Sequence, residues 1–221
     1  MAKTFERIVF LMYNKNMSKK EEFLEIFKTY IKRDGADKLL KWLENSDFFG
    51  APASTKFHSN YVGGLCDHSV NVYHRLKKLV IAEYGENYWE HFKDKEAKSS
   101  QEKADESLAI MGLLHDVCKI DTYKVEYRNV KVDEVWTKQP YFTVQEDLPF
   151  GHGEKSVYEL SAFIKLSREE AMAINWHMSG YDMRVKGGSY AISDAYYQYP
   201  IAVMLANADM MATYLDEKVE K

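Results

Sequence analysis

The chain has 221 residues, of which 46% are hydrophobic and 29% charged, enough apolar material for one sizeable core. Its formal net charge of −4 gives no bulk attraction to nucleic acid or to an acidic membrane, which argues against a dedicated DNA-binding module. Its two cysteines, Cys66 and Cys118, are too few for a disulfide framework and form no CxxC pair. We therefore expect a single compact unit in a reducing, cytoplasmic setting.

No segment has the pattern of a targeting or membrane-spanning sequence. The apolar run over residues 8–13 is shorter than the core of a signal peptide and lacks a small-residue cleavage site. Nowhere does an uninterrupted apolar stretch approach the ~20 residues that a membrane helix needs. These features predict a soluble protein with no membrane partner.

The N-terminal part predicts two helices. Ser18 followed by Glu21 is typical of a capping box that opens a helix running to Ile31. Gly35 separates this helix from a second one, with apolar positions spaced for one face. We expect residues 1–54 to form a helical hairpin and loop packed on a core made by the rest of the chain.

Residues 55–221 are expected to form that core. A long helix is predicted to begin at Gly63-Gly64, to carry His68, and to end near Gly85. The charged segment 93–106 favours a solvated face or a mobile loop.

The helical pattern changes after His115-Asp116, which ends an apolar helical run. Residues 121–150 alternate between apolar and polar side chains and are punctuated by prolines, which predicts a small β-hairpin or meander inserted in the helical unit. Helices are predicted again over 156–164, from Ser167 towards His177, and from Pro200 onward.

Asp209 lies in the last of these helices, whose faces are apolar on nearly every side. This predicts that its carboxylate is buried, which is costly without a positive partner. The helix itself offers no lysine or arginine. Histidines elsewhere in the chain could supply further ligands, so a metal ion is the natural candidate for that partner.

Four residues make the candidate set for a first ion: His68, His115, Asp116 and Asp209. His152 and His177 could hold a second ion, with Asp116 bridging the two. Nitrogen and oxygen ligands without thiolate suit Mn²⁺, Fe²⁺, Mg²⁺, Co²⁺, Ni²⁺ or Zn²⁺ rather than a structural zinc. Two divalent ions offset by two aspartates and a bridging hydroxide would leave a positive site, which a phosphate ester needs.

Other residues are candidates for contacting the substrate. Lys119 is either a solvated cation at the end of its helix or a phosphate contact. The segment 121–150 joins two groups of proposed ligands, which favours a flap whose aromatic residues stack on a base; the alternative is that its strands only cover the core. Base recognition by the loop from Phe48 to His58 is a further alternative. The candidate substrate-binding residues are therefore His58, Lys119, Tyr123 and Trp136.

Taken in order, these groups resemble the HD-domain superfamily of metal-dependent phosphohydrolases over about residues 55–215. The similar stretches are Gly63 to Ser69, Leu113 to Ile120, Gly151-His152-Gly153, Trp176-His177 and Ala208-Asp209. They are most similar to bacterial members in which HxxYxGGLxxH precedes the HD pair, some of them 3′→5′ exoribonucleases. The resemblance implies a mainly α, HD-domain helical bundle over 55–221. It also implies that His152 and His177 match the extra histidines of the two-metal branch, and that Lys119 contacts phosphate.

The expected function is therefore that of a metal-dependent phosphohydrolase, in which a metal-bound hydroxide cleaves a nucleotide or another phosphate ester. The expected catalytic residues are Asp116 and Lys119. Some of these exonucleases carry an accessory nucleic-acid-binding domain, where this sequence predicts only the N-terminal helical hairpin. We therefore expect a small nucleotide rather than long RNA as the substrate. Two alternatives stay open, a phosphodiesterase or 3′→5′ exonuclease on short RNA or DNA, and a catalytically inactive HD module that binds a nucleotide. An iron-dependent HD oxygenase would need substrate-clamping features that the sequence does not display.

Overall fold

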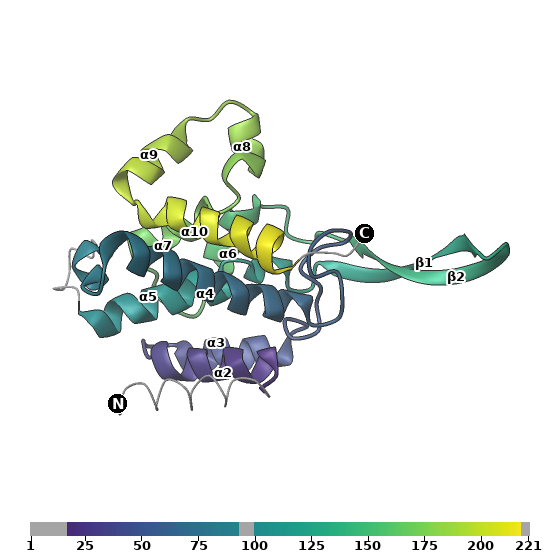
Figure 1. Ribbon diagram of the computed structural model, residues 1–221, viewed down its shortest axis with the longest axis horizontal. Coiled ribbons are helices and arrows are strands. Elements are labelled where there is room, and N and C mark those ends of the chain that lie inside the picture. The colour runs from purple at the N-terminus through teal and green to yellow at the C-terminus, as the bar shows by residue number, and fades with distance from the viewer. Residues whose placement is uncertain (1–16, 93–99, 218–221) are drawn as a thin grey trace.

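The computed structural model describes residues 17–92 and 100–217. Within these ranges the protein is mainly α-helical, with one antiparallel β-hairpin (Figure 1). The apolar run 8–13 and the first part of the charged segment 93–106 lie outside the described residues. None of the described helices combines the length and the apolar composition that crossing a bilayer requires.

The α-helices are α2 Lys19–Tyr30, α3 Ala36–Asn45, α4 Gly64–Tyr84, α5 Gln101–Leu114, α6 His152–Ser161, α7 Arg168–Asn175, α8 Met183–Lys186, α9 Ala191–Gln198 and α10 Ile201–Met211. The strands are β1 Tyr123–Val132 and β2 Val135–Val144. Short 3₁₀ turns are η1 Tyr88–His91, η2 Val117–Lys119 and η3 Ser179–Tyr181, and η4 Ala212–Asp216 is a π-helical turn.

The two predicted N-terminal helices are present. The capping box at the start of α2 is formed, with the backbone N–H of Ser18 donating to the Glu21 carboxylate at 2.8 Å. Gly35 has a φ of 92° and lies so close to the carbonyl of Phe163 that a Cβ there would be 1.9 Å from its oxygen. Only glycine fits this approach, which seats the start of α3 against the segment after α6.

Arg33, between α2 and α3, ties this part of the chain to two other helices. Its guanidinium donates to both carboxylate oxygens of Glu170 in α7, each at 2.8 Å. It also donates to Glu106 in α5 at 3.2 Å. Because Glu170 is fully buried, this charge-assisted network fixes α2 and α3 on α5 and α7.

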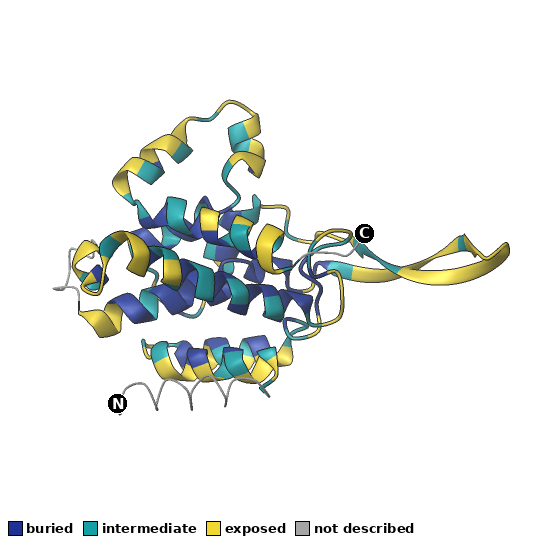
Figure 2. Ribbon diagram, in the orientation of Figure 1, coloured by how far each residue is buried: buried dark blue, intermediate teal, exposed yellow. Residues whose placement is uncertain are grey.

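The centre of the molecule is formed by α4 and α5, with α10 packed on α4 and α7 packed on α10. Buried residues concentrate on these helices (Figure 2). Gly112 in α5 lies against Tyr73 in α4, and a Cβ at position 112 would be 2.5 Å from the Tyr73 Cα. The missing side chain lets the two backbones approach closely, and α4 carries His68 while α5 ends at His115.

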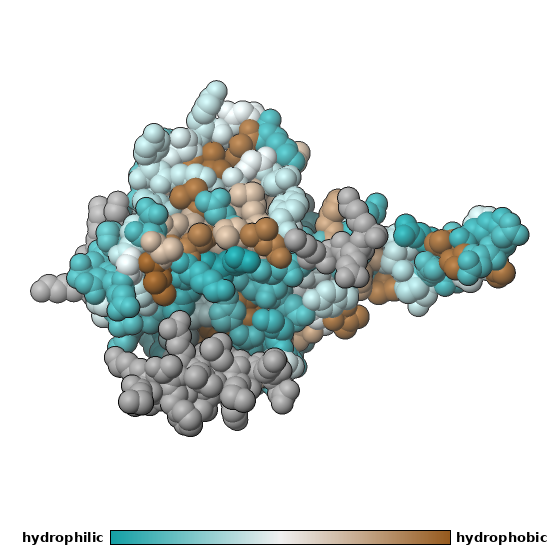
Figure 3. Space-filling view, viewed as in Figure 1, coloured by the Kyte–Doolittle hydropathy of each residue, from teal (hydrophilic) through white to brown (hydrophobic). Residues whose placement is uncertain are grey.

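The predicted β-hairpin is present within 121–150, but it covers little of the core. Its strands pair from Tyr123↔Val144 to Val132↔Val135, and Asp133 and Glu134 both have positive φ, as in a two-residue type I′ turn. Ten residues of extended chain make an arm about 30 Å long, which projects away from the helices (Figure 1). Most of its residues are exposed, and apolar side chains are scattered along its surface (Figure 3).

Candidate metal centre

The HD pair lies where a helix ends, as the chemistry of two adjacent ligands requires. Two neighbours on a regular helix point about 100° apart. Here His115 is the C-cap of α5 and Asp116 precedes the 3₁₀ turn η2, so the helical geometry changes between them. As a result, His115 Nε2 lies 3.5 Å from Asp116 Oδ2.

The carboxylate of Asp116 is the centre of a buried cluster. The residue is only 2% exposed. Five side chains place a nitrogen near its oxygens: His152 Nε2 at 2.9 Å and His177 Nε2 at 3.4 Å from Oδ1, and Lys119 Nζ at 2.6 Å, His115 Nε2 at 3.5 Å and His68 Nε2 at 3.6 Å from Oδ2. They come from α4, the end of α5, η2, the start of α6 and the turn after α7.

Asp209 completes the predicted set. Its Oδ1 lies 3.2 Å from His68 Nε2. The prediction that this carboxylate is buried was wrong in degree, because its side chain keeps 17% of its surface exposed. The reason is that α10 leaves one edge open to solvent at Asn207 and Met210, and Asp209 lies beside that edge.

The orientation of two imidazoles prepares them to act as ligands through Nε2. His115 Nδ1 is 3.0 Å from the carbonyl of Gly112, and His177 Nδ1 is 2.6 Å from the carbonyl of Ile174. A carbonyl can only accept, so each Nδ1 carries the hydrogen and each Nε2 of the neutral ring has a lone pair. His177 Nε2 is buried and has no hydrogen-bond partner among the described residues. Such backbone anchoring is typical of metal-bound histidines.

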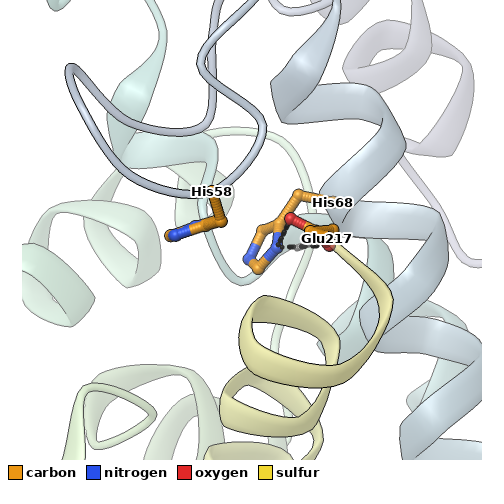
Figure 4. A group of neighbouring side chains, drawn as sticks. All are labelled: His58, His68 and Glu217. Atoms are coloured by element: carbon orange, nitrogen blue, oxygen red, sulfur yellow. Dashed lines mark hydrogen bonds and ion pairs between the residues drawn. The ribbon is translucent and has the colours of Figure 1, made fainter. Parts of the chain in front are cut away.

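His68 contacts a carboxylate that was not predicted from the sequence. Glu217 directs its carboxylate at His68 Nδ1, with distances of 3.1 and 3.2 Å (Figure 4). Glu217 follows Asp209 by eight positions, beyond the end of α10, and it matches none of the spacings from which the ligands were predicted. Its position depends on the π-helical turn η4, which a sequence pattern does not reveal.

Burial and neighbouring charges shift the pKa values of the cluster in opposite directions. Burial lowers the pKa of His115 to about 3, which keeps the ring neutral. Burial also opposes the charged form of His68, but hydrogen bonds with Asp209 and Glu217 raise its pKa to about 10. For Asp116, the opposing effect of burial is outweighed by Lys119, and its pKa lies well below the ordinary value. Asp116 is thus an ionised group inside the protein.

These atoms are close enough to share an ion. Their donor atoms lie within 4.8 Å of one another in each of three overlapping groups: His68, His115 and Asp209; His115, Asp116 and His177; Asp116, Cys118 and His152. Burial raises the pKa of the Cys118 thiol, so Cys118 is a small protonated side chain rather than a thiolate ligand. The buried His/Asp cluster could therefore hold a metal ion through nitrogen and oxygen atoms.

The candidate substrate-binding residues are divided between the cluster and the surface. His58 packs its ring on His68 at 4.8 Å between centroids, and Tyr123 donates to the carbonyl of Ala53 at 3.3 Å, at the base of the hairpin. Lys119 is buried and paired with Asp116. Trp136 is 69% exposed near the tip of the hairpin, so the structure does not bring it to the cluster.

The structure thus brings together all six predicted metal ligands and Lys119, places His58 beside them, and leaves Trp136 apart. The six ligands and Lys119 come from five parts of the chain: α4, the end of α5 with η2, the start of α6, the turn after α7, and α10. The chain matches no protein-family model, no curated protein and no solved structure.

Proposed function

We propose that the protein is a metal-dependent phosphohydrolase of the HD type, acting on a nucleotide or another small phosphate ester. One observation carries the proposal: four histidine Nε2 atoms lie within 3.6 Å of the Asp116 carboxylate. At least two of the four rings, those of His115 and His177, have their other nitrogen held by a backbone carbonyl. Lone pairs that converge on a buried carboxylate favour a cation between them.

The same residues suggest how the ions would be shared. His68, His115, Asp116 and Asp209 would hold a first ion, and Asp116, His152 and His177 a second one. Nitrogen and carboxylate donors suit Mn²⁺, Fe²⁺, Co²⁺, Ni²⁺, Zn²⁺ and, with more oxygen ligands, Mg²⁺. Such ions supply Lewis acidity towards phosphoryl oxygens and lower the pKa of a water.

The exposure of the side chains indicates the side from which a substrate would enter. His68, His115 and His177 are fully buried, whereas His152 keeps 34% and Asp209 17% of its side-chain surface exposed. The open side of the cluster therefore lies between the start of α6 and α10. Lys119 adds a positive charge 2.6 Å from Asp116, where it would help to neutralise the phosphate.

The test is metal content together with a substrate screen. Protein loaded with Mn²⁺, Mg²⁺, Ni²⁺ or Fe²⁺ should hold one or two ions by elemental analysis. It should release phosphate or nucleoside from members of a panel of nucleotides and cyclic dinucleotides. Asp116→Ala should lose both the metal and the activity because Asp116 is common to both proposed ion sites.

His91→Ala is the matched control, since His91 stacks on Tyr84 and touches no residue of the cluster. It should keep full metal content and full activity. Full metal content and retained turnover in Asp116→Ala would contradict the proposal. Tight nucleotide binding without turnover across the metal panel would instead favour an inactive nucleotide-binding module.

A phosphodiesterase or exonuclease on short RNA or DNA is the second candidate, and the projecting hairpin is the observation that favours it. Tyr127 and Trp136 are 60% and 69% exposed on this arm, and Lys138 lies over the Tyr127 ring at 5.1 Å. The bases of single-stranded nucleic acids stack on exposed aromatic side chains, and basic side chains attract their phosphate backbone. Release of mononucleotides from the end of an oligonucleotide would distinguish this activity.

A further inference from the structure

Glu217 is a buried carboxylate with polar contacts to three side chains. It lies in the turn after η4, with only 4% of its side chain exposed. Oε1 accepts from Asn71 Nδ2 at 3.1 Å, and Oε2 accepts from Ser59 Oγ at 2.7 Å. Both oxygens lie 3.1 to 3.2 Å from His68 Nδ1. The cost of burying this carboxylate is therefore offset by donors from three side chains.

The contacts on the two sides of the His68 ring are complementary. Asp209 lies on the Nε2 side at 3.2 Å, and Glu217 lies on the Nδ1 side. An ionised carboxylate can only accept, so both ring nitrogens carry a hydrogen here, Nδ1 facing Glu217 and Nε2 facing Asp209. An ion bound at Nε2 would take the place of the Nε2 hydrogen, whereas Glu217 would keep the hydrogen on Nδ1. Asp209 and Glu217 belong to one continuous segment, made of α10, η4 and the residue that follows η4, so this segment holds the imidazole from both sides.

A separate cation site at His58, His68 and Glu217 is the competing interpretation, because their donor atoms also lie within 4.8 Å of one another. Two observations argue against it. The Glu217 carboxylate already accepts from Ser59 and Asn71. In addition, an ion there would have to displace the hydrogen between His68 Nδ1 and Glu217.

We propose that Glu217 is a positioning residue, which fixes His68 with Nδ1 protonated and makes Nε2 a stronger metal ligand. This inference rests on the metal site of the proposed function. A carboxylate that accepts from the far nitrogen of a ligating imidazole fixes the tautomer, fixes the ring orientation and raises the basicity of the ligand. Asn71 and Ser59 in turn fix the carboxylate.

The experiment compares Glu217→Gln with a matched control, Asp216→Asn. Both changes remove one negative charge from the same turn, but Asp216 pairs with Arg75 at 2.8 Å and does not contact His68. Mn²⁺ affinity of the full chain is measured by titration calorimetry. Glu217→Gln should weaken Mn²⁺ binding about 10- to 100-fold, whereas Asp216→Asn should leave the affinity unchanged.

A second readout reports on the ring itself. In protein labelled with ¹⁵N-histidine and loaded with Zn²⁺, His68 Nδ1–H should give a slowly exchanging proton signal in the unsubstituted chain and in Asp216→Asn. In Glu217→Gln the exchange should be faster, which a merely structural role would not cause. If Glu217→Gln does not fold, Asn71→Ala replaces it, because this change removes one donor to Glu217. Asn71→Ala should also weaken Mn²⁺ binding and speed up exchange of the His68 Nδ1 proton, but by less than Glu217→Gln.

The outcomes separate this inference from the proposed function. Mn²⁺ affinity and His68 exchange unchanged in Glu217→Gln would overturn the role of Glu217 while the metal site stands. Absence of any bound ion in the unsubstituted protein would overturn both.

Discussion

Lys119 and the metal ions are expected to compete for the same carboxylate. The Lys119 ammonium lies 2.6 Å from Asp116 Oδ2, the same oxygen that His115 and His68 approach. Burial opposes its charged form, but the Asp116 carboxylate raises its pKa above the ordinary value, so Lys119 stays charged. A charged lysine at this position can balance Asp116 before an ion binds and phosphate charge afterwards.

Lys119→Ala should therefore keep its metal and lose catalysis. We expect Mn²⁺ binding to be at least as tight as in the unsubstituted protein, because a competing cation is gone. We expect kcat/KM to fall, because the transition state loses about 2.7 to 4 kcal/mol of stabilisation, as when an oxyanion donor is removed. Lys124→Ala, a change on the exposed hairpin, is the control. Unchanged kcat/KM in Lys119→Ala would give Lys119 a structural role only.

The site residues that could be predicted are those whose position relative to a predicted helix is clear from the sequence. His115-Asp116 closes an apolar helical run, and His68 follows a glycine pair that starts a helix, so both were expected at helix ends or inward faces. Glu217 could not be predicted, because its contact with His68 depends on a π-helical turn. Trp136 was predicted to contact substrate, and the alternation that located its strand says nothing about the direction in which the hairpin projects.

At the scale of elements, the site depends on how closely α4 and α5 approach. Gly112→Ala would place a Cβ 2.5 Å from the Tyr73 Cα, a backbone atom that cannot move aside without shifting α4. Alanine is the better helix former by about 1 kcal/mol, but overpacking should outweigh this gain. We expect a net loss of about 1 to 3 kcal/mol in the free energy of unfolding, measured by urea denaturation.

The same substitution should also weaken metal binding, since His68 and His115 lie on the two helices that it separates. Gly180→Ala is the matched control, because no atom lies within 4 Å of the Cβ that it would add. It should change neither stability nor metal affinity. A Gly112→Ala protein with unchanged stability would mean that the helices tolerate the wider spacing.

The hairpin is the second element whose role can be tested by removal. Replacing residues 129–138 with Asn-Gly would join Arg128 to Gln139, a directly paired position, through a two-residue turn. Tyr123 at the base would stay. Because the removed tip is remote from the cluster, metal content and KM for a small nucleotide should not change, whereas KM for an oligonucleotide should rise if the arm binds nucleic acid.

Trp136→Ala in the complete hairpin serves as the control for loss of one aromatic contact, worth about 1 to 3 kcal/mol per stacked base. It should show part of the effect on the oligonucleotide and none on the small nucleotide. A raised KM for the small nucleotide in either variant would show that the arm closes over the site, as the sequence first suggested.

At the scale of the whole molecule, the cluster joins parts of the chain that are far apart in sequence. His68 and Asp209 are 141 positions apart, yet their donor atoms lie 3.2 Å apart. Such a site cannot exist in the unfolded chain, so an ion that binds here binds the folded state. Metal binding must then stabilise the fold in proportion to its affinity.

Removing the ion should therefore lower the melting temperature. At a free metal concentration of about 100 times Kd, binding contributes about 2.7 kcal/mol to the free energy of unfolding. At about 2 to 4 °C per kcal/mol for a chain of this size, EDTA should lower Tm by roughly 5 to 10 °C, measured by calorimetry with and without Mn²⁺. Asp116→Ala should melt at the same temperature with Mn²⁺ or with EDTA, because its site is lost. Equal Tm values for the unsubstituted protein in Mn²⁺ and in EDTA would contradict the prediction, since the buried charges would then be balanced within the protein by Lys119 and the histidines alone.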